Sequence, residues 1–121
     1  MISSLSSDVV SDVQNLIAGR ARYLGLLDYP PVDMGIQTEN HSQGYSRQQI
    51  GWRVVRTGFL TMAAPVTFTG LDSPLVVMAL GVFDGVGGAS KMVGWGALED
   101  PLTAINGTIQ VAAGAVSIRI G

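Results

Sequence analysis

The stretch from residue 75 to residue 120 constrains the fold more than any other part of this chain, because it divides into short apolar or alternating runs. The runs cover residues 75–84, 91–98, 107–112 and 115–120, and glycine, proline, asparagine and aspartate separate them. Runs of this length with turn residues between them predict successive β-strands joined by tight loops. The sequence therefore predicts a core built from sheets.

Further strands are expected before this stretch. Their predicted ranges are residues 21–27, 45–56, 57–62 and 66–69. Together with the later runs they make about eight strands, and no alternation of strands with helices is visible, which disfavours a parallel doubly wound sheet. The expected fold is mainly β, an antiparallel jelly-roll-like sandwich, with a turn starting at Glu99 and Asp100 before Pro101.

The N-terminal residues predict an α-helix over about residues 4–18, because apolar side chains recur there at helical spacing. The expected apolar face consists of Leu5, Val9, Val13 and Leu16, with Val10 and Ile17 beside it. A serine at position 3, 4 or 6 is expected to cap this helix. The chain thus divides into a helical arm over residues 1–19 and a sandwich domain over residues 20–121. The helix packs either on its own sheet or on a neighbouring subunit.

Composition limits the partners of the chain. Its 121 residues suit one domain, and a hydrophobic share of 47% beside 13% charged residues is apolar for that size. We therefore expect other subunits, including copies of the chain, to cover part of its surface. The net charge of -2 provides no basic field for nucleic acid, so direct binding to DNA is not expected.

Cysteine content and hydropathy limit the chain further. The sequence has no cysteine, which excludes disulfides and thiolate metal sites. Its longest apolar run, residues 74–83, is far shorter than the roughly 20 residues of a membrane helix. The first residues lack the basic start of a secretory signal, so we expect a soluble product made inside the cell, without a membrane partner.

No pattern in the sequence predicts catalysis, a cofactor or a metal. His41 is the sole histidine and lies in a polar loop over residues 32–44, where a solvated side chain is expected rather than a member of a catalytic triad. The glycine-rich run at residues 85–91 lacks the residue order of a phosphate-binding loop. Four acidic residues considered for calcium, without the dense spacing of a calcium loop, are Asp28, Asp33, Glu39 and Asp84.

Candidate interaction residues surround the long polar loop. Loops longer than about 12 residues are often functional. Tyr29 and Tyr45 flank this loop, His41 lies within it and Arg47 follows it, so these side chains are the candidates for contact with a partner. Most of the other aromatic residues, Trp52 and Trp95 among them, are expected to anchor the core.

Several short motifs occur in a characteristic order. They are Tyr23-Leu-Gly-Leu-Leu27, Gly44-Tyr-Ser-Arg-Gln48, Leu80-Gly-Val-Phe-Asp84, Gly94-Trp-Gly-Ala-Leu98 and Ala112-Ala-Gly-Ala-Val-Ser-Ile118. This order resembles that of a family of small tailed-phage virion proteins. The resemblance covers about residues 20–120. Ser46 stands where the family often has alanine, and Asp28-Tyr-Pro-Pro31 replaces its more usual Asp-Pro-Gly turn.

This resemblance implies a noncatalytic structural part of a bacteriophage virion, made in the cytoplasm of the host bacterium. The first expectation is a capsid cement or decoration protein, a homotrimer that binds the major capsid protein and stabilises the head. The alternative is a tail-fibre or baseplate module that contacts other tail proteins or a host receptor through Tyr29, His41 and Tyr45. A third reading, a carbohydrate-acting enzyme on a jelly roll, would use Glu99.

Overall fold

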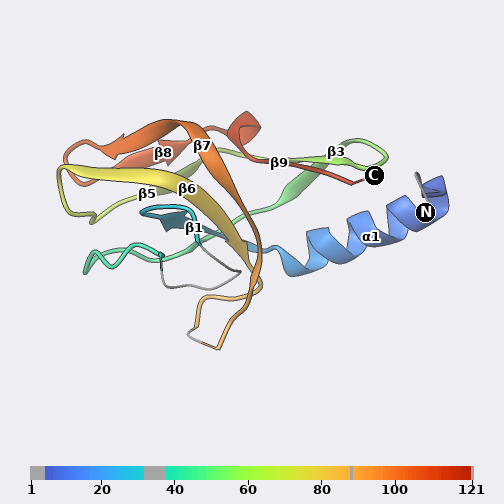
Figure 1. Cartoon of the computed structure of the whole chain (residues 1–121), viewed down its shortest axis with the longest axis horizontal. Helices are drawn as coiled ribbons and strands as arrows, with labels where there is room; N and C mark the ends of the chain where they lie inside the picture. Colours follow the sequence, from blue (N-terminus) through green and yellow to red (C-terminus); the bar gives the residue numbers. More distant parts are fainter. Residues whose placement is uncertain (1–4, 32–37, 88, 121) are drawn as a thin grey trace.

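The computed structural model describes residues 5–31, 38–87 and 89–120 (Figure 1). Its elements are α1 (Ser7–Arg20), β1 (Tyr23–Leu27), β2 (Gln48–Gln49), β3 (Trp52–Arg56), β4 (Phe59–Met62), β5 (Val66–Phe68), β6 (Leu75–Phe83), β7 (Met92–Ala104), β8 (Ile109–Val111), the 3-10 turn η1 (Ala113–Ala115) and β9 (Ser117–Arg119). The sheets are antiparallel, with 46% of the described residues in strands and 16% in helix. The predicted mainly β sandwich with one N-terminal helix is confirmed.

The core lies between the largest sheet and the two smaller ones. The largest sheet has the strand order β2-β1-β6-β7, and the smaller sheets have the orders β3-β4-β9 and β5-β8. Leu24 and Val77 of the large sheet meet Met62, Phe68 and Val111 of the smaller sheets in one buried cluster. Figure 1 shows β5 and β8 running alongside β6 and β7. Apolar side chains from both layers therefore hold the sandwich together.

The prediction of one strand over residues 45–56 is wrong, because this segment contributes to two sheets. β2 pairs with β1, whereas β3 pairs with β4. The change of sheet occurs at Ile50 and Gly51, where the Ile50 N–H donates to Arg22 and the Gly51 carbonyl accepts from Ala63. The alternation of apolar and polar residues continues through Ile50 and Gly51, so it could not show that the segment leaves one sheet and joins another there.

The prediction of a turn at Glu99 and Asp100 is also wrong, because β7 continues from Met92 to Ala104. Val77 of β6 pairs with Leu102, and Ala79 pairs with Ala97, so residues 98–101 bulge opposite one residue of β6. β7 is an edge strand. An edge strand tolerates Pro101, which has no N–H to donate to a neighbouring strand.

The helix begins and ends later than predicted, and it buries a different face. Ser6 caps it, as expected, by accepting the Val9 N–H at 3.3 Å. The buried side chains are Val10 and Gln14, whereas the predicted apolar residues Leu5, Val9 and Leu16 are 46%, 44% and 58% exposed. This face of the helix is buried because Gln14 makes a polar contact with the hairpin. Gln14 Oε1 accepts the backbone N–H of Gly58 at 2.8 Å.

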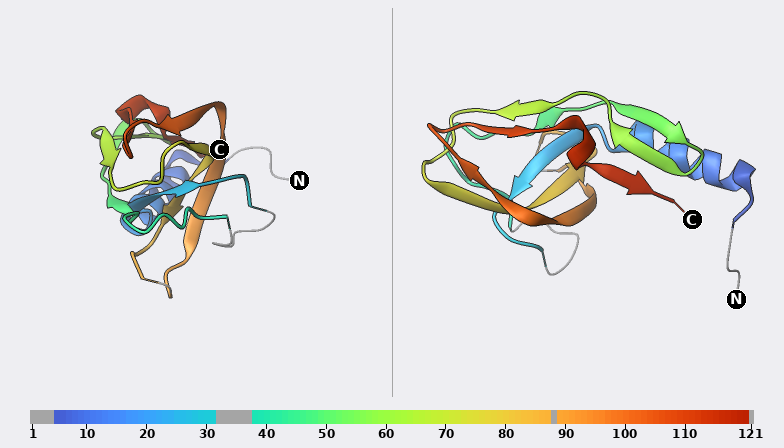
Figure 2. Two further views of the ribbon diagram at one scale, coloured as in Figure 1. Left: turned by 90° about the vertical axis from the view of Figure 1, so that its left-hand side faces the viewer. Right: turned by 90° about the horizontal axis from the view of Figure 1, so that it is seen from above.

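Gly58 lies in the turn between β3 and β4, so this contact joins the helix to the β3–β4 hairpin. We call α1 and residues 52–62 the helix–hairpin lobe. Figures 1 and 2 show this lobe extending away from the rest of the sandwich, with the start of α1 at its far end. The lobe is therefore surrounded by the chain on fewer sides than the main body.

Candidate functional site

The predicted interaction residues divide into an exposed pair and an inward-facing pair. Tyr29 is 59% exposed, and His41 is also exposed. Tyr45 is half-buried and Arg47 is 9% exposed. Binding of a partner by any of the four stays a prediction. Of the long loop, residues 32–37 lie outside the described residues, and the part from Thr38 onward is largely buried.

Tyr45 and Arg47 both bind the carboxylate of Glu39. The Tyr45 hydroxyl donates to Glu39 Oε2 at 2.5 Å, and Arg47 donates from Nε to Oε2 at 2.8 Å and from Nη2 to Oε1 at 2.9 Å. The Tyr45 oxygen in turn accepts the Leu26 N–H of β1 at 3.1 Å. We call Glu39, Tyr45 and Arg47 the Glu39 network. Its two-pronged pairing of Arg47 with a carboxylate is the strongest geometry available to an ion pair.

The network also binds the end of β6. The Arg47 guanidinium lies 3.7 Å from the centre of the Phe83 ring and donates from Nη1 to the Gly85 carbonyl at 2.8 Å. Gly25 leaves room for this arrangement, since a Cβ there would meet Phe83 Cε1 at 2.6 Å and the Tyr45 hydroxyl at 2.8 Å. Tyr45 thus joins the network to β1, and Arg47 joins it to residues 83–85, while both bind the Glu39 carboxylate.

Electrostatics fix the charge state of the network. Burial and the hydrogen bond to Glu39 raise the pKa of the Tyr45 phenol above its usual value. The hydrogen bond to Glu39 raises the pKa of Arg47 as well. The phenol is therefore a donor that keeps its proton, and it is not available as a base near neutral pH.

A second set of polar contacts holds the same loop. Asn40 donates to Asp28 at 2.9 Å and accepts the Ser42 N–H at 2.9 Å. Ser42 Oγ accepts the Asp72 N–H at 3.1 Å. Sequence reasoning missed Glu39 and Asn40 as structural residues, because their partners lie on other segments and no local spacing signals them.

Of the acidic residues considered for calcium, Asp28 accepts from Asn40, Glu39 belongs to the network and Asp84 accepts the Lys91 N–H at 2.8 Å. Asp33 lies outside the described residues. Within residues 5–31, 38–87 and 89–120, no three histidine, cysteine, aspartate or glutamate side chains gather in a way that could hold a metal ion.

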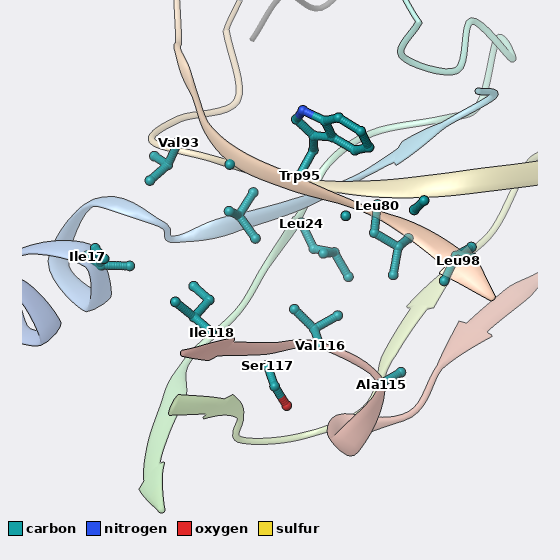
Figure 3. Close-up of a pocket in the computed structure, with 14 residues that line it drawn as sticks. Ile17, Leu24, Leu80, Val93, Trp95, Leu98, Ala115, Val116, Ser117 and Ile118 are labelled. Atoms are coloured by element: carbon teal, nitrogen blue, oxygen red, sulfur yellow. The ribbon is translucent and has the colours of Figure 1, made fainter. Parts of the chain in front are cut away.

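An apolar cleft of about 500 Å³ lies between the two layers. Ile17, Leu24, Leu80, Val116 and Ile118 are among its lining residues, and their side chains point toward one another in Figure 3. β7 and β9, which border the cleft, are edge strands of different sheets. The sandwich is therefore open along this side. Trp95, expected as a core anchor, is instead 38% exposed and forms part of the lining.

A smaller hollow of about 320 Å³ lies beside the Glu39 network. Val86 and Gly87 line it together with the three network residues, Asn40 and Ser46. Among the described residues that line these two hollows, Glu39 is the one with a carboxylate. Glu99 and Asp100 line neither and are exposed on the β7 bulge.

The polar and the apolar sites thus differ in what they offer to a partner. In the Glu39 network the ionised groups bind one another, whereas the cleft presents apolar side chains. Among the described residues, no helix has both the length and the hydropathy needed to cross a membrane. No protein-family model, curated protein or solved structure matches this chain.

Proposed function

We propose that the protein is a noncatalytic structural component of a bacteriophage virion, and specifically a capsid cement protein that binds shell subunits and copies of itself. The observation that carries the assembly role is the exposed apolar surface of the helix–hairpin lobe. Val9, Leu16, Val54 and Val55 are between 44% and 58% exposed there, and Leu5, just before α1, is 46% exposed. Exposed apolar residues gathered on one projecting part of a small protein favour contact with other proteins.

The energetics suit a contact that is repeated many times. Fully burying a valine or leucine side chain stabilises by about 1.5–3 kcal/mol, and these side chains are already about half buried. Each contact is therefore modest by itself. Many symmetric copies on a shell add such increments, which is how a cement protein stabilises a capsid.

The phage assignment rests on the resemblance to tailed-phage virion proteins, and the structure provides a physical reason for its motifs. Gly25, Tyr45, Arg47 and Phe83 belong to three of those motifs, and all four meet in or around the Glu39 network. The motifs therefore share the task of fixing the main body. A rigid body suits a structural part, which must keep its shape while it binds neighbours.

Counting the copies in purified virions tests this proposal. We expect gel densitometry against the major capsid protein to find the chain in virions of the phage that encodes it. A copy number in the hundreds supports the cement role, and a homotrimer is the expected form. Absence of the chain from the particles overturns the proposal.

The second candidate is a tail-fibre or baseplate module, favoured by the exposure of Tyr29 and His41 beside the long loop. A copy number of a few per particle would favour it over cement. Glycan binding that Tyr29→Ala abolishes would then identify the contact. Turnover of a glycan, abolished by Glu99→Gln, would instead support an enzyme and contradict both structural roles.

A further inference from the structure

The exposed side of α1 carries an apolar stripe with an acidic residue in it. Val9, Asp12 and Leu16 follow a spacing of three and four residues, which places them on one side of a helix, and Leu5 precedes the helix start. Asp8 lies next to this stripe in the first turn. The helix uses Val10 and Gln14, on another face, to contact its own hairpin. The stripe is therefore not needed for packing within the chain.

The outer strand of the same lobe has the opposite charge. β3 is an edge strand, and its exposed residues read Arg53, Val54, Val55 and Arg56. Val54 and Val55 are 54% and 48% exposed. The sequence has no acidic residue between Glu39 and Asp72, so the whole hairpin is basic. Among the described residues, Arg53 and Arg56 form no ion pair, and neither do Asp8 and Asp12.

The two surfaces match in both hydropathy and charge. We propose that the α1 stripe of one copy docks on β3 of a second copy, with Val9 and Leu16 against Val54 and Val55. Asp8 and Asp12 then lie opposite Arg53 and Arg56. Contact of apolar with apolar side chains and of acidic with basic side chains specifies a partner more sharply than apolar area alone.

The occupant is a second copy because α1 of the same chain is already bound to the hairpin through Gln14 and Val10. Each lobe carries one acidic stripe and one basic strand, so the contact closes as a reciprocal pair or as a small ring. This inference rests on the proposed assembly role and names the contact between copies. It does not require that the copies bind a capsid.

Sedimentation velocity over a range of concentrations tests the contact through charge reversal. We expect the wild-type chain to associate, and R53E/R56E to weaken association by about tenfold or more, since like charges then face each other. D8R/D12R should weaken it equally, and combining all four substitutions should restore it. The matched control for R53E/R56E is R22E/K91E, which makes the same change in net charge as R53E/R56E at exposed positions outside the two surfaces.

A monomeric wild-type chain at every concentration overturns the contact, and so does a failure of the fourfold variant to associate. Circular dichroism of each variant separates loss of folding from loss of association. A chain that stays monomeric in solution yet is present in virions would refute this contact and leave the proposed function standing.

Crosslinking provides a second test, because the chain has no cysteine of its own. V9C mixed with V55C should form a disulfide-linked dimer of the two variants under mild oxidation, since α1 of one copy faces β3 of the other. V9C mixed with V86C is the control, because Val86 is 65% exposed and lies outside both surfaces. Equal crosslinking in both mixtures overturns the proposed docking.

Discussion

The Glu39 network and the helix–hairpin lobe reverse the usual distribution of polar and apolar residues. In the network, Glu39 and Arg47 are charged and yet about nine-tenths buried. In the lobe, large apolar side chains such as Leu16 and Val54 are more than half exposed. The buried charges satisfy one another within the chain, whereas the exposed apolar groups have no such arrangement. The comparison teaches that charged side chains are buried in this chain where they bind one another, whereas these apolar side chains stay in solvent where no other described segment covers them.

The largest expected effect comes from breaking the buried ion pair. Arg47→Ala leaves the Glu39 carboxylate buried without its cation, so the free energy of unfolding should fall by about 3–5 kcal/mol. Urea denaturation measures this change. Arg53→Ala is the matched control, expected within about 0.5 kcal/mol of wild type because Arg53 is exposed. Equal losses for both variants would remove the distinction between the network and the lobe.

The next effect concerns the one buried polar contact between the helix and the hairpin. Gln14→Ala leaves the Gly58 N–H without its acceptor, at a cost of about 1–3 kcal/mol in unfolding free energy. Asn15→Ala, at the adjacent exposed position, should change stability by less than about 0.5 kcal/mol. Thermal unfolding of the two variants side by side gives the comparison. A silent Gln14→Ala would mean that the contact with Gly58 does not position the helix.

The network should also make stability depend on alkaline pH. The pKa of the Tyr45 phenol is raised above its usual value of about 10, so the unfolded chain releases this proton at lower pH than the folded chain. Stability should be constant with respect to this group below about pH 10 and fall above it, by at most about 1.4 kcal/mol per pH unit. Urea midpoints between pH 8 and roughly 11 measure the slope. Tyr45→Phe should make the decline shallower, and an unchanged slope would show that the phenol is not responsible.

The smallest effect is expected on the exposed stripe of α1. Leu16→Gln should change the unfolding free energy of the isolated chain by less than about 0.5 kcal/mol, because the side chain is 58% exposed. Dilute samples keep association out of this measurement. A loss of about 2 kcal/mol or more would show that the stripe stabilises its own domain, and would weaken the contrast between the two regions.

Local sequence patterns predicted the strands and the helix well where neighbouring residues determine the structure. The short runs after residue 75 became β6 to β9, and Ser6 capped the helix as its hydroxyl suggests. The same patterns gave wrong predictions where a contact with a distant segment of the chain determines the structure. The break at Gly51, the continuous β7 through Pro101 and the buried Gln14 all depend on partners far away along the chain.

The candidate interaction residues show the same division. Tyr45 and Arg47 stood out in the sequence beside the long loop, but their partner Glu39 did not, since a glutamate in a polar loop looks like any solvated side chain. The phage role, the homotrimer and the absence of catalysis stay predictions, tested by the virion and association experiments above.

By itself, the sequence determined the class of fold, because the alternation of apolar residues with turn residues commits each segment to a strand or a helix over a few residues. Only the tertiary structure decided which side chains are buried. That choice depends on which segments meet, so a glutamate in a polar loop became a buried ion-pair partner while a leucine on a helix stayed in solvent. The contrast between the buried ionic contacts of the Glu39 network and the exposed apolar side chains of the lobe exists only once those segments have packed.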